Sequence, residues 1–509
     1  MNRRQFLKCL GGLLPSLALG WMPPSRFASQ TSPTGTPNVL ILLFDAFSAR
    51  NVSLLGYPRQ TTPNLTAFAS AATVYHRHYA AGNFTNPGTA SLLTGTYPWT
   101  HRALHLFDTV ARPLVGNNVF RTFSAGYHRI SYSHNLQVTG LLYDFRPDLE
   151  EFKWTRELCL ADNQMADLWF PEDYNMALWR ERLFRGSGYI RSAPTSLLIH
   201  RLSNSLWSRR LRRLESTYRE LFPQGLPNLN DQVFLLEDAI NWLIQHMPQL
   251  PKPFLAYFHL LPPHDPYKPR REFIGRFDDG WQPVAKPRHS FAGPASQEEL
   301  NRLRCEYDEF IAYADAEFGR LCRAMVQGGW LDSTCLVLTS DHGEMFERGI
   351  WQHTTETLYE PVVHIPLLVS WPGQQQRQDV YAPTSCVDVL PTLLHATGQP
   401  IPDWCEGQVL PPFAPEEELE GRSIYVVEAK RNAQQGPLTK ATVAMIRGRH
   451  KLIHYLGYPG YEDRWELYDL GEDPEELHDL YSPENPEAHE LQAELSAKLE
   501  EVNHPYRRS

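Results

Sequence analysis

Two aspartates and a histidine follow apolar runs that have the character of buried strands. Asp45 comes directly after residues 39–44, and Asp341 and His342 come shortly after residues 335–339. Burying a carboxylate at such a position is costly unless another group pairs with it. For either aspartate alone, a helix cap or a turn residue is the simpler interpretation. Two such positions in one sheet, one of them within Asp-His-Gly, predict a divalent cation shared by Asp45 and Asp341.

A threonine is a second candidate for chemistry. Thr85 lies in a run of small and hydroxylated residues that leads into Ala-Ser-Leu-Leu at residues 90–93, which is a plausible start of a helix. A hydroxyl at a helix N-terminus is well placed as a nucleophile, because the free N–H groups and the helix dipole favour an alkoxide and an incoming anion. On local sequence alone, a plain helix cap is the simpler interpretation of Thr85.

Strands and helices must position these side chains. Four apolar runs predict central strands, and they lie at residues 39–44, 254–258, 335–339 and 365–369. Continuous apolar runs are typical of parallel strands that are covered on both faces. Because helical patterns alternate with these runs, the sequence predicts an α/β fold with a mostly parallel, doubly wound sheet. Ligand-binding side chains would then lie at the carboxyl ends of the strands.

We expect a catalytic domain over residues 37–410 and a small α+β subdomain over residues 411–509 that packs on it. Residues 146–230 are rich in Trp, Arg and Leu with a helical pattern, so we interpret them as an insertion over the sheet edge. Short strand-like runs at close spacing predict an antiparallel sheet in the C-terminal subdomain, followed by a helix. These runs lie at 422–428, 441–446, 451–455 and 465–470, and the helix at 486–502.

The insertion contains a basic run, Arg209-Arg210-Leu211-Arg212-Arg213. This run could bind an anionic substrate or surface. A solvated helix face whose arginines pair with Glu215 and Glu220 is the simpler interpretation. Together with the loop 270–289, the insertion is expected to form the walls of a substrate cleft.

The N-terminus has the features of an export signal. Arg3 and Arg4 precede a short apolar stretch at residues 9–21, and this pattern resembles the twin-arginine signal. An amphipathic helix of the folded domain is the alternative. We therefore expect residues 1–36 to be a signal and linker, and the mature protein to be periplasmic or extracellular. Because no later run reaches about 18 apolar residues, no transmembrane segment is expected in the mature protein.

Composition excludes some classes of protein. The chain has 509 residues, of which 42% are hydrophobic and 21% charged, so a disordered protein is excluded. A net charge of −10 argues against a nucleic-acid partner. The seven cysteines show no spacing typical of a zinc knuckle or a redox pair, and the sequence leaves open whether any form a disulfide. The oligomeric state is likewise left open.

The order and spacing of several motifs resemble the sulfatase branch of the alkaline phosphatase superfamily, from Asn38 to about Tyr481. The matching segments are Asp45 after its strand, Thr62-Pro63-Asn64-Leu65, residues 85–95 ending in Ala-Ser-Leu-Leu-Thr-Gly, Pro263-His264-Asp265-Pro266-Tyr267, Ser340-Asp341-His342-Gly343-Glu344, His353 through Leu358-Tyr359-Glu360, Lys451-Leu452-Ile453 and residues 466–470.

This resemblance implies a fold and a set of roles. The fold would be a large mixed, mostly parallel sheet sandwiched by helices, with the small antiparallel subdomain at the C-terminus. Asp45, Asp341 and His342 would hold one divalent metal ion, with Thr85 at the nucleophile position and within reach of the metal. His264 and His353 would contact the ester oxyanion or the leaving group.

Three positions depart from the family pattern. Position 85 is threonine where sulfatases convert Cys or Ser to formylglycine, so no formylglycine is expected. The motif arginine is replaced by Thr89, and the usual second aspartate after the first metal ligand is Ala46. The remaining ligands, two carboxylates, an imidazole and a hydroxyl, favour Zn²⁺ or Mn²⁺ over Ca²⁺, which prefers about six or more oxygens.

Two functions fit these departures. The first is a metal-dependent hydrolase of sulfate or phosphate esters of a small molecule or a glycan, with Thr85 as the nucleophile. Phosphate or phosphonate esters are favoured, because a threonine sulfate would be hard to hydrolyse whereas formylglycine enzymes release theirs by elimination. The alternative is a catalytically degenerate protein that binds a glycan or an anionic ligand. The retained charged residues favour the enzyme, since a decayed site should lose groups that are costly to bury.

Overall fold

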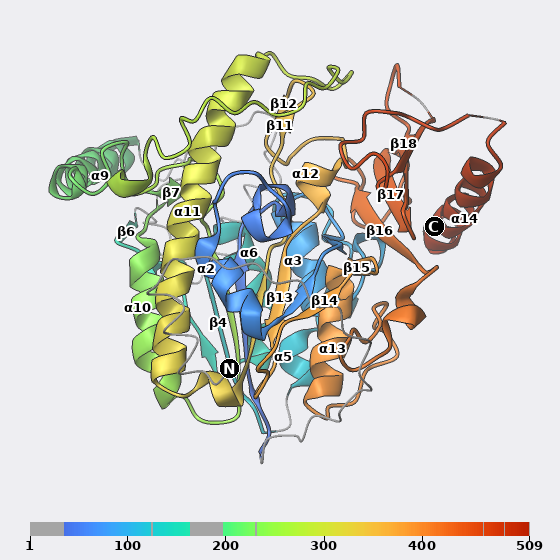
Figure 1. The fold of residues 1–509 in the computed structure, drawn as a ribbon. Helices are drawn as coiled ribbons and strands as arrows, with labels where there is room; N and C mark the ends of the chain where they lie inside the picture. Colours follow the sequence, from blue (N-terminus) through green and yellow to red (C-terminus); the bar gives the residue numbers. More distant parts are fainter. Residues whose placement is uncertain are drawn as a thin grey trace, which may run out of the picture.

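The computed structural model describes residues 35–123, 126–162, 197–229, 232–461, 463–482 and 484–507. The predicted export signal lies outside the described residues except for residues 35 and 36, and so does part of the predicted insertion. An eight-stranded sheet in the order β14-β2-β13-β10-β1-β9-β4-β5 forms the centre of the molecule (Figure 1). Its strands are β1 Asn38–Phe44, β2 Thr73–Tyr75, β4 His128–Ser133, β5 Glu151–Phe152, β9 Phe254–Leu260, β10 Thr334–Thr339, β13 Leu367–Ser370 and β14 Gln378–Val380.

The sheet is mixed but mostly parallel, as predicted. β1 pairs in parallel with β9 and β10, and β4 pairs in parallel with β9 and β5. β13 is antiparallel to both β10 and β2, and β14 is parallel to β2. Every residue of β1, β9 and β10 is buried, which is why their sequences are nearly continuous in apolar residues.

Helices cover both faces of the sheet. Val39, Ile41 and Leu43 of β1 belong to one core cluster, and the alternating residues Leu40 and Leu42 belong to another. The first cluster includes residues of α3 Thr85–Thr94, α4 Pro98–His101, α5 Val119–Thr122, α6 Leu136–Asp144 and α13 Val389–Ala396. The second includes residues of α2 Pro63–Phe68, α10 Leu236–His246 and α11 Gln297–Gln327. The two layers lie on opposite sides of the sheet in Figure 1.

A four-stranded antiparallel sheet follows at the C-terminal end, as predicted. It consists of β16 Ser423–Glu428, β17 Ala441–Arg447, β18 His450–Leu456 and β19 Arg464–Asp469, and the helix α14 Pro486–Asn503 comes after it. A buried charge network joins this sheet to α12 Glu360–Val363. Within it, Lys451 Nζ lies 3.0 Å from Glu360 Oε1 and 2.8 Å from Glu476 Oε1.

Smaller elements complete the described part of the chain. They are β3 His78–Tyr79 with β15 Thr384–Ser385, the hairpin β11 Phe346–Glu347 and β12 Ile350–Trp351, the strands β6 Ala161–Asp162, β7 Asn228–Leu229 and β8 Gln232–Val233, and the helix α9 Leu197–Tyr218. The six cysteines in the described part of the chain are all unpaired. Among the described helices, none has the length and apolar character needed to cross a bilayer.

Candidate metal and ester-binding site

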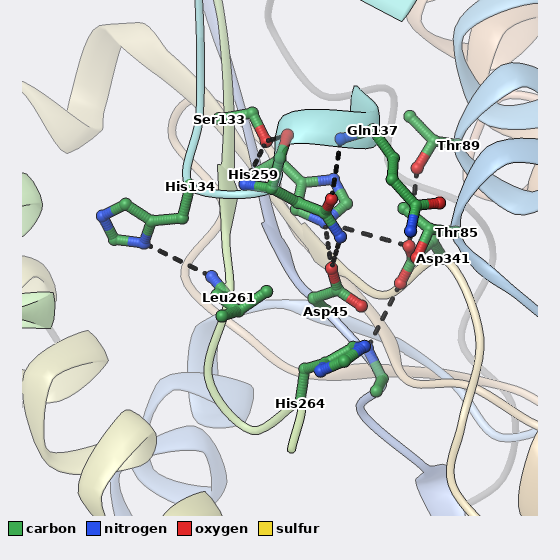
Figure 2. Close-up of polar contacts among 12 residues, drawn as sticks. Asp45, Thr85, Thr89, Ser133, His134, Gln137, His259, Leu261, His264 and Asp341 are labelled. Atoms are coloured by element: carbon green, nitrogen blue, oxygen red, sulfur yellow. Dashed lines mark hydrogen bonds and ion pairs between the residues drawn. The ribbon is translucent and has the colours of Figure 1, made fainter. Parts of the chain in front are cut away.

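The polar residues gather where neighbouring parallel strands end. Asp45 follows β1, Asp341 follows β10 by two residues, and His259 is the sixth of the seven residues of β9. Asn135 follows β4 by two residues. Since β10, β1, β9 and β4 are adjacent in the sheet and run in parallel, their carboxyl ends meet at one edge. Figure 2 shows Asp45, His259, Asp341, His264 and Thr85 converging there.

The four predicted metal-site residues form a compact group around the His342 imidazole. Its Nε2 lies 3.4 Å from Asp45 Oδ1, 3.6 Å from Asp341 Oδ2 and 3.4 Å from Thr85 Oγ1. Metal–ligand bonds of about 2.0–2.2 Å in a tetrahedron place neighbouring donor atoms about 3.3–3.6 Å apart. These three separations therefore fit donors that share one divalent cation.

An unsatisfied oxygen supports the same conclusion. Asp45 is fully buried, and its Oδ1 accepts no hydrogen bond from any described residue, although His342 lies nearby. A buried carboxylate oxygen without a partner is costly, and a coordinated cation would remove that cost. The residues present thus fit a divalent metal ion bound by Asp45, Asp341 and His342, with Thr85 beside it.

The other oxygen of Asp45 is held by two residues that the sequence analysis did not select. Asp45 Oδ2 lies 2.9 Å from His259 Nε2 and accepts a hydrogen bond from Asn135 Nδ2 at 2.8 Å. His259 Nε2 also lies 3.8 Å from Asp341 Oδ2, and the ligand atoms of Asp45, His259 and Asp341 all lie within 4.8 Å of one another. His259 is therefore a second candidate for the imidazole ligand.

Geometry favours His342 over His259 as that ligand. The 2.9 Å separation between His259 Nε2 and Asp45 Oδ2 is a hydrogen-bond distance, and Tyr257 Oη lies 3.0 Å from the other ring nitrogen, Nδ1. With Tyr257 donating to Nδ1, the His259 proton resides on Nε2 and is donated to Asp45. We therefore assign His259 and Asn135 to orienting Asp45, as groups behind a metal ligand commonly do.

Mutual charge shifts the protonation of the site. Burial would raise the pKa of Asp45, but His264, His259 and His342 outweigh it and hold that pKa well below its usual range. Burial and the neighbouring Asp45 raise the pKa of Asp341. The two carboxylates outweigh burial at His342 and raise its pKa to about 9. A cation would replace the His342 proton as the balancing charge, because a coordinating imidazole is neutral.

Thr85 is the first residue of α3, and this helix is pressed against the end of β10. A side-chain Cβ at Gly88 would lie 2.1 Å from the Asp341 carbonyl oxygen, so only glycine permits the close approach. Thr89, which replaces the motif arginine, donates a hydrogen bond from Oγ1 to Asp341 Oδ2 at 3.5 Å. The helix start thereby places a hydroxyl and free backbone N–H groups beside the two carboxylates.

Position 46 is alanine, and its backbone contacts Asp341. Ala46 has a φ of 59°, which is the left-handed region, and its N–H donates to Asp341 Oδ1 at 3.3 Å. A non-glycine residue in this region costs of order 1 kcal/mol and persists where the surroundings enforce it, commonly at functional sites. The Ala46 N–H group donates to Asp341 but cannot coordinate a metal ion, so an alanine here offers no ligand from its side chain.

His264 and His353 lie beside His342. Their ring centroids are 4.9 Å apart, and the His353 ring centroid is 4.1 Å from that of His342. His264 Nδ1 lies 2.7 Å from the Asp265 carbonyl oxygen, and His353 Nδ1 lies 3.1 Å from Glu344 Oε1. Because both Nδ1 atoms donate to these oxygens, Nε2 of each ring is left for other partners.

Burial and the neighbouring charges shift the pKa values of these two histidines in opposite directions. It lowers the pKa of His353, as do the charges of His342 and His264, so that this pKa lies well below its usual range. At His264 burial is outweighed by Asp265, Asp45 and Glu344, and the pKa is raised. Burial also raises the pKa of Glu344 to about 7, against the opposing effect of His264. The pair thus holds one imidazole that favours the neutral form and one that favours the charged form.

Gln137 is a further polar residue that the sequence analysis did not select. Figure 2 shows its side chain extending from the start of α6 toward Thr85 and Asp341. Its Oε1 is buried and has no hydrogen-bond partner among the described residues. Such an unsatisfied group beside the site can contact a bound ester. All six predicted site residues and Gln137 therefore belong to one cluster.

Comparisons with known proteins give matches over most of the chain. A family model described as Sulfatase matches residues 37–155 and 162–399, and one described as N-sulphoglucosamine sulphohydrolase, C-terminal, matches residues 347–505. The chain is 25% identical over 496 residues to a choline-sulfatase of Rhizobium meliloti (strain 1021), and this alignment covers 91% of this chain and 86% of that protein. It is 25% identical over 486 residues to an ulvan-active sulfatase of Formosa agariphila, which covers 92% of this chain and 81% of that protein.

Solved structures show the same fold. The phosphonate monoester hydrolase of Agrobacterium radiobacter superposes with a TM-score of 0.65 at 19% identity, covering 92% of this chain and 96% of that chain. A 2-O GAG sulfatase superposes with a TM-score of 0.62 at 17% identity, covering 93% of each chain.

Proposed function

Since the chain belongs to the sulfatase family, we propose that it is a metal-dependent hydrolase of phosphate, phosphonate or sulfate esters in which Thr85 is the nucleophile. The family and the relatives make it a sulfatase-like ester hydrolase. One observation carries the assignment of the nucleophile: Thr85 Oγ1 lies 3.4 Å from His342 Nε2, at the first residue of a helix and beside two buried aspartates.

The protein groups divide the work of the reaction. A divalent cation held by Asp45, Asp341 and His342 would supply charge neutralisation and lower the pKa of the Thr85 hydroxyl. The Thr85 hydroxyl loses its proton to solvent, and Oγ1 then attacks the phosphorus or sulfur atom, so that the new bond forms as the bond to the leaving oxygen breaks. The free N–H groups of α3 stabilise the equatorial oxygens. His264 is placed to give a proton to the leaving oxygen. Water then attacks the phosphorus or sulfur atom, its oxygen joins the released acid, one of its protons returns to His264, and the bond to Thr85 Oγ1 breaks to restore Thr85 for the next cycle.

The identity of residue 85 favours phosphorus over sulfur in the substrate. A formylglycine hydrate can release sulfate by elimination, because a second hydroxyl on the same carbon collapses to the aldehyde. Thr85 has a single oxygen, so its ester must be released by water attacking phosphorus or sulfur. We therefore expect phosphate or phosphonate esters of a small molecule or a glycan to be turned over faster than sulfate esters. The donor set favours Zn²⁺ or Mn²⁺ as the metal.

A degenerate binding protein is the second candidate function. The loss of the motif arginine at Thr89 and of the second aspartate at Ala46 favours it. Both functions predict that the site holds an anionic ligand, but only the enzyme requires Thr85 for turnover.

We also propose that the protein is exported through the twin-arginine route, on the strength of Arg3, Arg4 and the apolar stretch that follows them. A reporter protein fused behind residues 1–36 should leave the cytoplasm. Replacing both arginines with lysine should retain it there, and export of the doubly substituted fusion would contradict the proposal.

A metal-supplemented screen tests the enzymatic function. The mature protein is incubated with Zn²⁺ or Mn²⁺ and with aryl phosphate monoesters, diesters, phosphonates and sulfates. We expect turnover of at least one phosphorus ester, and loss of that turnover in Thr85→Ala. Thr94→Ala is the matched control, because Thr94 lies at the other end of α3 with its hydroxyl bonded to Ala90. Ligand binding without turnover of any ester would favour the binding protein.

A further inference from the structure

The helix α9 (Leu197–Tyr218) carries the basic run and lies at the outer edge of the molecule, away from the catalytic site (Figure 1). One side of it is attached to the protein. Trp207, Leu211, Leu214 and Tyr218 are partly buried and pack against the core cluster beneath. Their spacing of four, three and four residues places them on a single helical face.

The opposite face carries the charge. Arg209, Arg212 and Arg213 are exposed there, and Arg210 is exposed at its border. On a helix of 3.6 residues per turn, Leu206 falls on this same outward face, and 64% of its surface is exposed. The outward face is therefore both basic and partly apolar.

These arginines are not neutralised within the described part of the chain. The simpler interpretation of the basic run requires ion pairs with Glu215 and Glu220, but no ion pair joins either glutamate to an arginine of the run there. Exposed arginines elsewhere do form ion pairs, as Arg302 does with Glu306 on α11. In a protein with a net charge of −10, four arginines within five residues that form no ion pair with any described residue create a local positive potential.

We propose that the outward face of α9 docks the protein on an anionic lipid surface. Basic side chains along such a helix are attracted by anionic headgroups, and an exposed leucine among them can enter the boundary between headgroups and acyl chains. The exposed leucine favours a bilayer over a sulfated glycan or another purely polar polyanion, which offers no apolar region. This proposal is independent of the reaction at Thr85.

Vesicle sedimentation tests the proposal with the mature protein. We expect binding to vesicles of phosphatidylcholine with 30–40% phosphatidylglycerol (roughly the charge density of an anionic membrane), little binding to pure phosphatidylcholine, and release at high salt. Replacing Arg209, Arg210, Arg212 and Arg213 with serine should lower the partition coefficient by about a hundredfold or more, at about fivefold for each arginine. Leu206→Ser should weaken binding to vesicles but not binding to heparin.

A matched control removes the same charge elsewhere. Arg431, Arg449, Arg464 and Arg507 are exposed and lie in the C-terminal part of the chain. Replacing these four with serine should leave vesicle binding within a fewfold of the unsubstituted protein. Circular dichroism and the melting temperature establish that both quadruple variants are folded. Equal vesicle binding by the two quadruple variants would overturn the proposal, and so would the absence of binding to anionic vesicles. An equal loss of vesicle binding and heparin binding in Leu206→Ser would also overturn it.

Discussion

Replacing His259 with alanine should weaken metal binding without abolishing it. The substitution removes one of two contacts that hold Asp45 Oδ2, the 2.9 Å contact to His259 Nε2, and leaves the 2.8 Å hydrogen bond from Asn135. Loss of a residue that orients a metal ligand lowers metal affinity by about 10- to 100-fold. Such a loss corresponds to about 1.4–2.7 kcal/mol of binding free energy. Loss of a coordinating imidazole should cost more than this.

Titration of Zn²⁺ or Mn²⁺ in competition with a chelator measures this effect. Asn135→Ala is the matched variant, because it removes the other contact to the same oxygen, and His342→Ala removes the assigned ligand. We expect similar losses of affinity for His259→Ala and Asn135→Ala, and a larger loss for His342→Ala. If His259→Ala abolished binding while His342→Ala resembled Asn135→Ala, His259 would be the ligand. An unchanged affinity in His259→Ala would refute the role given to it.

Two further predictions concern catalysis and stability. Gly88→Ala would place a Cβ 2.1 Å from the Asp341 carbonyl oxygen and displace the start of α3, so we expect turnover to fall about a hundredfold. Gly140→Ala is the control in the same rate assay, because nothing lies within 4 Å of its new Cβ. Equal rates for the two variants would contradict the prediction. Burial raises the pKa of Asp315 from 3.8 to about 6. The folded state therefore favours the protonated form of Asp315. The contribution of this proton to the free energy of unfolding is present below about pH 4 and is lost as the pH rises through about 6. Between pH 4 and 7 the free energy of unfolding of the unsubstituted protein should fall by about 2 kcal/mol relative to Asp315→Asn, as measured by urea unfolding. Parallel pH curves for the two proteins would contradict this prediction.

The sequence predicts three residues of the site from the strands that they follow, and it predicts Thr85, His264 and His353 mainly through the resemblance of their motifs to the family. Asp45, Asp341 and His342 follow continuous apolar runs, which identify both the strand and the place where it ends. The two residues that orient Asp45 lack this signal. His259 lies within β9 opposite Leu43 of β1, and its inclusion in the site depends on the register of that pairing. Asn135 follows β4, whose sequence His-Arg-Ile-Ser-Tyr-Ser is not a continuous apolar run.

In the fold, too, some elements could be predicted from the sequence and others could not. The central strands β1, β9 and β10 could be predicted because they are buried on both faces and are apolar throughout. β2 and β14 have three residues each, too few to establish a pattern, so the edge of the sheet could not be ordered from the sequence. Nor could the sequence decide whether the arginines of α9 are paired, because helical spacing alone does not determine where long side chains lie.

The central claim is that Thr85 forms the covalent intermediate. The most direct measurement is a rapid acid quench of the metal-loaded protein during turnover of an aryl phosphate or phosphonate ester, followed by mass spectrometry of the peptide that contains Thr85. We predict an added phosphoryl or phosphonyl group on that peptide, and a rate in Thr85→Ala at least about a thousandfold lower. Full activity of Thr85→Ala, with no modified peptide in the unsubstituted protein, would contradict the account.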